Sequence, residues 1–273
     1  MEKLQAALAK ARSDRSAPRG AGGGLKVRVP RPVRPGPTGQ DALWQGLPAM
    51  RLSDRALAKH RIVTREASDD STPFDIMRTK ILLQMQQNGW SRLAVTSPMP
   101  QSGKTTTACN LALGLGRQNG LRAMLFDFDL NDPSVHAFFE QTPDHTIGEV
   151  LSQDVDFADQ ALRIGDNVAV SMSNRVEDDP TRILLSEKTE DVLDSIQDRY
   201  KPDIMIFDLP SVLVGDNTRA FLKNVDCALI IARANTTRYA QFDTCEREIA
   251  EHTNVLGVVL NAFRHGAAQN DFE

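Results

Sequence analysis

The segment SPMPQSGKTT, residues 97–106, decides the fold because it joins a strand-like run to a helix-like run. Residues 93–96 are strand-like, and residues 107–117 have the pattern of a helix. A loop in this position points backbone N–H groups and a helix N-terminus at an anion. In such a loop a lysine reaches the terminal phosphates and a threonine hydroxyl binds Mg²⁺. The segment therefore predicts a phosphate-binding loop with six candidate binding residues, Gln101, Ser102, Gly103, Lys104, Thr105 and Thr106.

The loop matches the general pattern of phosphate-binding loops incompletely. That pattern has a glycine six positions before Lys104, where Pro98 stands, and Gly103 is the one glycine of the segment. Taken alone, the four residues 103–106 also fit an ordinary capped helix start. The interpretation therefore depends on other parts of the chain.

Two further apolar runs end in aspartate. Residues 124–129, MLFDFD, contain Asp127 and Asp129, and residues 204–208, IMIFD, end in Asp208. Side chains two positions apart on a strand project to the same side, and ligands of an open parallel sheet bind outside the C-terminal edge of the strands. All three carboxylates are therefore expected beside the Mg²⁺ of a bound nucleotide. The alternative is that each aspartate only caps a strand or begins a turn.

The alternation of strand-like and helix-like segments predicts the fold class. Strand-like runs, several of them continuously apolar, recur at residues 93–96, 123–128, 168–171, 204–207, 228–232 and 255–260. Continuous apolar runs are typical of a parallel sheet covered on both faces. One helix is expected to begin at Asp70-Ser71-Thr72, followed by Pro73, which supply its N-cap and first-turn residues, and to end at Asn88-Gly89. We predict a P-loop NTPase-like α/β fold, with a mostly parallel central sheet and helices on both faces.

The N-terminal residues have an amphipathic pattern. Leu4, Ala7, Leu8 and Ala11 recur at helical spacing, so a short amphipathic helix is predicted for residues 1–15. A helix this short is unstable alone. It would dock on a partner, stay frayed or touch anionic lipid.

The following stretch is basic and rich in proline and glycine. Residues 11–40 contain seven basic side chains, one acid, five prolines and six glycines. Such a composition does not favour a packed core. We therefore predict a flexible N-terminal extension, with a basic linker at residues 16–42 and a nucleotide-binding domain at residues 43–273.

The composition excludes several classes of protein. Of the 273 residues, 41% are hydrophobic and 25% are charged, which is ordinary for a globular chain. The net charge of −4 argues against nucleic acid as a partner. The longest apolar stretches, residues 227–232 and 255–263, fall short of the roughly 18–20 residues needed to cross a bilayer. Residues 1–15 lack the apolar region of a secretory signal, so we expect a cytoplasmic protein.

Together the motifs resemble those of the bacterial tyrosine kinases (BY-kinases) of capsule and exopolysaccharide synthesis, a branch of the MinD/ParA-like P-loop ATPases. Residues 96–105 resemble the first phosphate motif of these kinases. Residues 125–133 resemble the second motif, apolar residues and then Asp-x-Asp-Leu-Arg-x-Pro, and residues 206–211 resemble the third, apolar residues and then Asp-x-Pro-Pro. The resemblance covers approximately residues 61–262. The second motif is specific, because ordinary P-loop proteins lack it.

The resemblance implies that the chain binds ATP with Mg²⁺ and transfers or hydrolyses the terminal phosphoryl group. It assigns catalytic roles to Lys104, Asp127, Asp129 and Asp208. Thr105, Asp127 and Asp208 would hold Mg²⁺ directly or through water, and Asp129 would accept the proton of the attacking hydroxyl. The six loop residues named above would bind the phosphates, and Asn261, at the end of the last strand, would contact the adenine.

The resemblance also implies partners. Relatives without a transmembrane segment work with a separate membrane protein, the chain-length determinant of polysaccharide synthesis, so we expect such a partner and peripheral association with the cell membrane through it. Members that assemble as rings carry Glu-x-x-Arg-x-x-Arg on the first helix. The corresponding positions are Thr72, Asp75 and Arg78, so only the last residue is retained. A homo-oligomer and a monomer are both left open.

Several positions depart from the family pattern. The kinases usually carry Gly and Glu where Gln101 and Ser102 stand, and Asn131 replaces the usual arginine of the second motif. Kinases that phosphorylate themselves typically end in a tyrosine cluster, whereas the two tyrosines of this sequence are Tyr200 and Tyr239. We expect both to be packing residues.

Three functions follow from these observations. The first is an ATP-dependent tyrosine kinase or ATPase that regulates exopolysaccharide polymerisation and export. The second is a catalytically weak nucleotide-binding protein that regulates a membrane partner. The third is a MinD/ParA-type ATPase, although Met99 stands near the position where those proteins have a signature lysine.

Overall fold

The structure, a computed structural model, describes residues 39–263. The helix predicted at residues 1–15 and most of the linker predicted at 16–42 lie outside the described residues. Within residues 39–263, seven strands form one sheet, β1 (Arg92–Thr96), β2 (Ala123–Asp127), β3 (Leu162–Ile164), β4 (Val168–Ser171), β5 (Ile204–Asp208), β6 (Cys227–Arg233) and β7 (Asn254–Asn261). The helices of this part are α2 (Gly39–Gly46), α3 (Asp54–Lys59), α4 (Thr72–Asn88), α5 (Lys104–Gly116), α6 (Val135–Phe138), α7 (Ile147–Leu151), α8 (Phe157–Gln160), α9 (Pro180–Leu185), α10 (Glu187–Tyr200), α11 (Asn217–Leu222) and α12 (Tyr239–Ala250).

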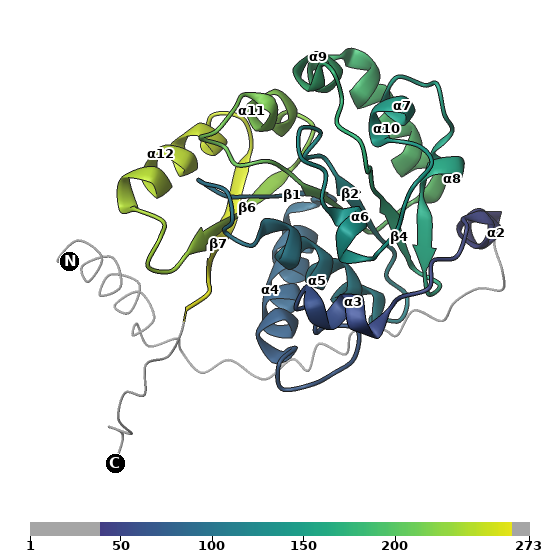
Figure 1. Cartoon of the computed structure of the whole chain (residues 1–273), viewed down its shortest axis with the longest axis horizontal. Helices are drawn as coiled ribbons and strands as arrows, with labels where there is room; N and C mark the ends of the chain where they lie inside the picture. The colour runs from purple at the N-terminus through teal and green to yellow at the C-terminus, as the bar shows by residue number, and fades with distance from the viewer. Residues whose placement is uncertain (1–38, 264–273) are drawn as a thin grey trace, which may run out of the picture. The chain divides into compact units, whose positions relative to one another are not determined.

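The strands lie in the order β3-β4-β2-β5-β1-β6-β7. Figure 1 shows the sheet that they form. Every neighbouring pair is parallel except β3 and β4, which are antiparallel. The predicted mostly parallel sheet is confirmed. The short edge strand β3 was not predicted, because its three residues are half-buried and do not form a continuous apolar run.

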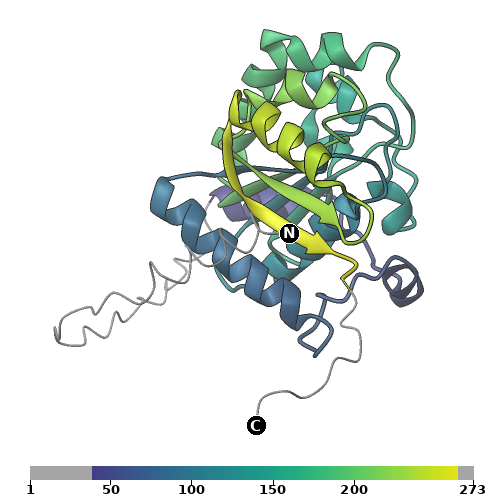
Figure 2. The ribbon, with the colours of Figure 1, turned by 90° about the vertical axis from the view of Figure 1, so that its left-hand side faces the viewer.

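Apolar side chains of the central strands point alternately to two separate cores, one on each face of the sheet. In β1, Leu93 and Val95 pack with α3, α4 and α5, whereas Ala94 packs with the core that includes α10, α11 and α12. Figure 1 shows these two groups of helices on opposite sides of the sheet, and Figure 2 brings β7 and α12 to the front. The predicted helices on both faces are therefore confirmed.

Helix α4 begins and ends as predicted, with Ser71 as its N-cap residue. It starts at Thr72 with Pro73 in the first turn, and it ends before Gly89, whose φ of 69° allows the left-handed turn. Ser71 does not cap the helix with its side chain. Its hydroxyl donates instead to the carbonyl of Ser68 and to the carboxylate of Asp75. Ser71 is thus the N-cap residue by position, but these partners occupy its hydroxyl.

Arg78, the residue retained from the ring pattern, is buried between α4 and α5. Its Nη1 donates to Asp75 Oδ1 at 2.7 Å and to the Gly114 carbonyl at 2.9 Å. Arg117 donates to the same Asp75 carboxylate at 2.9 Å. The guanidinium of Arg78 is therefore engaged inside the domain rather than presented to a second subunit.

Packed structure begins before residue 43, the start predicted for the domain. Helix α2 covers Gly39–Gly46, and its Trp44 is buried against α10. Trp44 Nε1 donates to the Tyr200 carbonyl at 2.8 Å, and the two rings meet edge to face at 6.3 Å. None of the helices in residues 39–263 is both long enough and apolar enough to cross a membrane.

Replacing Trp44 by phenylalanine tests this contact. The variant Trp44→Phe keeps an aromatic ring but leaves the buried Tyr200 carbonyl without its donor. We therefore expect the free energy of unfolding to fall by about 1–2 kcal/mol. This corresponds to a melting temperature lower by roughly 3–6 °C in scanning calorimetry. Trp90, which makes no side-chain hydrogen bond within residues 39–263, supplies the control Trp90→Phe, for which a smaller change is expected. Equal melting temperatures of Trp44→Phe and wild type would contradict this account.

Candidate functional site

The predicted phosphate loop connects β1 to α5, and two of its side chains hydrogen-bond to one carbonyl of the loop. The Met99 carbonyl accepts hydrogen bonds from the hydroxyls of Ser97 at 2.8 Å and Ser102 at 2.7 Å. Gln101 and Gly103 both have left-handed backbones, with φ of 59° and 92°. Gly103 is the N-cap residue of α5. The chain therefore makes a tight turn directly before a helix of 13 residues.

This turn contains free backbone donors. The N–H groups of Ser102 and Gly103 donate to no protein atom within residues 39–263. The side chain of Ser102 is buried, and Lys104 and Thr105 begin the helix beside it. Free N–H groups at the N-terminus of a helix attract an anion, because the helix dipole is positive there. The loop thus has the donors that a phosphate group requires.

The strand order brings Asp127 and Asp208 together. β2 and β5 are adjacent and parallel, and these two residues are register partners at the C-terminal ends of the strands. Asp127 Oδ2 accepts from the backbone N–H groups of Ser134 at 2.9 Å and Val135 at 2.8 Å. Asp208 Oδ1 is buried and has no hydrogen-bond partner. Both carboxylates are nearly inaccessible to solvent.

Burial governs the protonation of this pair. It raises the pKa of Asp208 to about 7, although a hydrogen bond from Thr105 and the charge of Lys104 act in the opposite direction. Burial, and then the neighbouring Asp208, raise the pKa of Asp127 well above its ordinary value. Two adjacent buried carboxylates favour either a shared proton or a cation beside them.

Lys104, Thr105 and Asp129 surround a cavity of about 420 Å³ on one side of the loop. Lys104 Nζ donates to Ser211 Oγ at 3.3 Å, and Thr105 Oγ1 lies 3.3 Å from Ser134 Oγ. Asp129 is half-buried, and burial raises its pKa despite the charge of Lys104. This cavity brings together a lysine, the hydroxyls of Thr105, Ser134 and Ser211, and a partly accessible carboxylate.

A larger cavity of about 800 Å³ lies on the other side of the loop, so the loop separates two spaces. Gln101, Lys104 and Thr105 line both cavities. The lining of the larger cavity also includes Gly103, Thr106, Asn261, Arg233, Phe74, Phe138 and His60. The His60 and Phe138 rings are 4.4 Å apart at a 31° angle. The larger cavity therefore combines polar loop groups with aromatic walls.

Asn261, predicted to contact adenine, is bonded to the loop. Its Nδ2 donates to the Ser102 carbonyl at 2.8 Å, and its Oδ1 accepts from the N–H of Ala262. It also lines the larger cavity. The adenine contact stays a prediction, and the contact that the structure has is with the loop.

The donor set suits Mg²⁺ bound together with phosphate better than an all-protein metal site. No group of three or more His, Cys, Asp and Glu residues that could hold a metal occurs within residues 39–263. Mg²⁺ typically uses one or two carboxylates together with water and substrate phosphate. The unpartnered Oδ1 of Asp208 and the Thr105 hydroxyl fit that requirement. Asp127 accepts hydrogen bonds from two backbone N–H groups, so it would contact Mg²⁺ through water or through neighbouring residues.

Three residues of the site were missed at the level of sequence. Ser134 and Ser211 follow the aspartates of the second and third motifs, so their position in those motifs was a usable signal. Arg233 donates to the Gln101 carbonyl at 2.5 Å. An arginine at the end of a strand has no local signal that separates it from a solvated surface charge.

The two tyrosines differ in environment. Tyr200 is buried, as expected for a packing residue. Tyr239 is 74% exposed, so the packing role predicted for it is wrong. Helix α12 packs through Cys245 and Ile249, and Tyr239, six residues before Cys245, lies off that face at 100° per residue.

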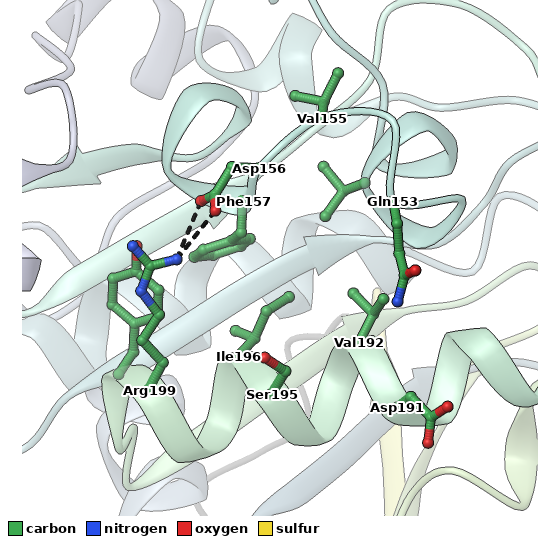
Figure 3. A pocket seen from close by; sticks show the side chains of 11 residues that line it. Gln153, Val155, Asp156, Phe157, Asp191, Val192, Ser195, Ile196 and Arg199 are labelled. Carbon is green, nitrogen blue, oxygen red and sulfur yellow. Dashed lines mark hydrogen bonds and ion pairs between the residues drawn. The ribbon is translucent and has the colours of Figure 1, made fainter.

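A third cavity lies apart from the loop. It has a volume of about 300 Å³ and is lined by α10 and by residues of the 150–157 segment (Figure 3). Phe157 and Ile196 form part of its apolar floor, and an ion pair of 3.1 Å joins Asp156 to Arg199 at one side. It shares no lining residue with the two cavities beside the loop. We therefore do not include it in the candidate site.

A phosphate loop between a strand and a helix, with carboxylates at the ends of adjacent parallel strands, defines the class of P-loop nucleotide-binding proteins. The model of the CobQ/CobB/MinD/ParA nucleotide binding domain family (CbiA) matches residues 93–273. The chain belongs to this family.

Relatives by sequence are named tyrosine kinases. The tyrosine-protein kinase YwqD of Bacillus subtilis is 26% identical over 202 residues, which are 73% of this chain and 84% of YwqD. EpsB of Ralstonia nicotianae is 23% identical over 206 residues, which are 74% of this chain but 27% of EpsB. The chain thus spans most of YwqD and about a quarter of EpsB. The predicted resemblance to the bacterial tyrosine kinases is confirmed.

Solved structures share the fold. The chimeric protein CapA2B2 matches with a TM-score of 0.68 and 22% identity, covering 84% of this chain and all of CapA2B2. Cobyrinic acid a,c-diamide synthase of Mycobacterium smegmatis, solved with an ATP analogue and magnesium, matches with a TM-score of 0.54 and 21% identity, covering 63% of this chain and 72% of the synthase. Both likenesses concern the fold.

Proposed function

We propose that this chain binds ATP and Mg²⁺ at the loop of residues 101–106 and acts as a kinase-like regulator of capsule or exopolysaccharide synthesis. One observation carries the proposal. Lys104 and Thr105 stand between two cavities and next to the carboxylate of Asp208, in a chain that is similar to a named tyrosine kinase over 202 residues. The likeness to kinases favours this function over that of a MinD/ParA-type ATPase.

The geometry supports a division of roles around the bound nucleotide. The free N–H groups of Ser102 and Gly103 would hold the β-phosphate, and the Lys104 ammonium would neutralise charge on the γ-phosphoryl group. Thr106 would contact the α-phosphate. The nucleoside would occupy the larger cavity, whose 800 Å³ is ample for it and whose wall contains His60 and Phe138. Mg²⁺, when bound, would neutralise phosphate charge, and Thr105 and Asp208 are the residues placed to hold it.

Phosphoryl transfer would take place in the smaller cavity. Asp129 lies there within the field of Lys104, and its pKa is raised by burial, which suits a group that accepts a proton. The hydroxyl of the acceptor would give its proton to Asp129 as its oxygen bonds to the γ-phosphorus and the bond to ADP breaks. Asn131 lines the same cavity, so its replacement of the usual arginine bears on acceptor binding.

We also propose that the chain works at the membrane through a separate chain-length-determinant protein. The motivation is its likeness to EpsB, of which it spans about a quarter. Such a complex would place the chain at the inner face of the cell membrane. The same proposal allows this chain to form a homo-oligomer.

A second candidate function is a nucleotide-binding regulator with weak catalysis. It is favoured by Gln101, a non-glycine residue in the left-handed region, and by the absence of arginine at position 131. Such a protein would bind nucleotide and change its affinity for the membrane partner without modifying it.

Incubation with labelled ATP and Mg²⁺ separates the two functions. For the full chain with the candidate membrane partner, we expect label in phosphotyrosine of the partner, or release of phosphate. No label is expected at Tyr200, because it is buried. The variant Tyr239→Phe identifies any label on the exposed tyrosine. Nucleotide binding in calorimetry without transfer or hydrolysis would instead support the regulator, and no binding at all would contradict both functions.

A further inference from the structure

Two neighbouring carbonyl groups of the loop are held by two neighbouring strand ends. Arg233 Nη1 donates to the Gln101 carbonyl at 2.5 Å, and Asn261 Nδ2 donates to the Ser102 carbonyl at 2.8 Å. Arg233 and Asn261 are register partners at the ends of the parallel strands β6 and β7. The Ala234 N–H donates to the Asn261 carbonyl at 2.9 Å, which extends this pairing beyond the strands. The two side chains therefore form one clamp on consecutive peptide groups.

The clamp fixes the direction of the free N–H groups. In a trans peptide the C=O and the following N–H point in opposite directions. Holding the Gln101 carbonyl towards Arg233 therefore aims the Ser102 N–H away from β6, and holding the Ser102 carbonyl aims the Gly103 N–H away from β7. Neither of these N–H groups donates to a protein atom within residues 39–263.

The clamp also explains two residue choices in the loop. Gln101 has φ of 59°, a conformation that costs a residue with a Cβ atom more than it costs glycine. A hydrogen bond from a charged guanidinium is strong enough to offset that cost. At Gly103, a Cβ atom would lie 2.1 Å from Asn261 Nδ2, so only glycine leaves room for the asparagine.

We propose that Arg233 and Asn261 are positioning residues that hold the loop in its phosphate-binding conformation, with Arg233 compensating for the non-glycine residue at position 101. The proposal rests on the proposed nucleotide binding at this loop, and it adds that these side chains act on the backbone and not on the nucleotide. The ligand class is the phosphate chain of a nucleoside di- or triphosphate.

A double-mutant cycle between positions 233 and 101 tests the clamp. With ADP and Mg²⁺ as the probe in calorimetry, Arg233→Ala should weaken binding about 10-fold, and Gln101→Gly in the same chain should restore it to within about 3-fold of wild type. Arg233→Lys, which keeps a charged donor, should bind nearly as wild type. Asn261→Asp, which replaces the donor by an acceptor at equal size, should weaken binding at least 10-fold. Arg247→Ala, an exposed arginine paired within α12, is the matched control and should bind as wild type.

If Arg233 contacts the nucleotide itself, Arg233→Ala weakens binding equally with and without Gln101→Gly, and this result would overturn the proposal. A second readout needs no nucleotide. In its absence, Arg233→Ala should lower the melting temperature by roughly 2–4 °C, and by less than half as much when Gln101→Gly is present. If wild type binds no ADP, the proposed function fails, and the melting temperatures still decide the clamp. If the two substitutions change the melting temperature additively, the clamp is refuted.

Discussion

ATP turnover is expected to fall at least about 1,000-fold in the variant Lys104→Met, because the γ-phosphoryl group loses the fixed positive charge that stabilises its transition state. Lys104 Nζ donates a hydrogen bond to Ser211 in the smaller cavity. Within residues 39–263, Lys104 is the one lysine that lines both cavities beside the loop, whereas Lys59 lines only the larger cavity. Methionine keeps the length of the side chain, so the fold should survive. The measurement is phosphate release or transfer at saturating ATP, together with thermal melting.

The control for this variant is Lys80→Met. Lys80 is exposed on α4 and lines neither cavity beside the loop. It should turn over ATP as wild type does. Normal turnover by a folded Lys104→Met protein would refute the assignment of the site.

The second large effect concerns stability. The variant Asp208→Asn should stabilise the nucleotide-free protein by about 4 kcal/mol above pH 7, while ATP turnover is lost. The reason is that burial raises the pKa of Asp208 to about 7 from 3.8, and each pKa unit corresponds to about 1.4 kcal/mol. Asparagine fills the same space without a charge to desolvate.

The sign of the pH dependence follows from this raised pKa. Between pH 4 and pH 7 the native Asp208 holds its proton when the unfolded aspartate has lost it, so wild-type stability falls as the pH rises through this interval. The variant does not titrate at this position. The difference between Asp208→Asn and wild type should therefore be small near pH 4 and largest above pH 7.

Denaturant unfolding at pH 4, 6 and 8 measures this difference. Asp191→Asn is the control, because Asp191 is exposed and has no ion pair within residues 39–263. Mg²⁺ with ADP should stabilise wild type more than Asp208→Asn. If Asp208→Asn is less stable than wild type at pH 8, the carboxylate is stabilised by contacts that the structure does not contain.

Local patterns predicted most of the fold. All six strand-like runs became strands, since β1, β2, β4, β5, β6 and β7 correspond to them within one or two residues. Helix α4 and the position of the loop were also predicted. Among the elements that were not predicted individually, α2 and β3 are short and lack a long apolar period, so their formation depends on contacts such as that between Trp44 and Tyr200.

The candidate site was predicted in its residue types but not in its arrangement. The sequence identified Asp127 and Asp208 as equivalent carboxylates, whereas in the structure two backbone N–H groups hold Asp127 and one oxygen of Asp208 has no partner. The exposure of Tyr239 was likewise not predictable, because it depends on which face of α12 packs.

By itself the sequence determined an α/β domain, the loop at residues 101–106 and three strand-end aspartates, because each of these features depends on a local pattern of neighbouring residues. Only the tertiary structure decided that β2 lies beside β5 and that β6 and β7 end beside the loop. That strand order pairs Asp127 with Asp208 and brings Arg233 to the Gln101 carbonyl, 132 residues away in sequence. Strand order depends on packing the whole sheet between its two layers of helices, and no local pattern encodes it.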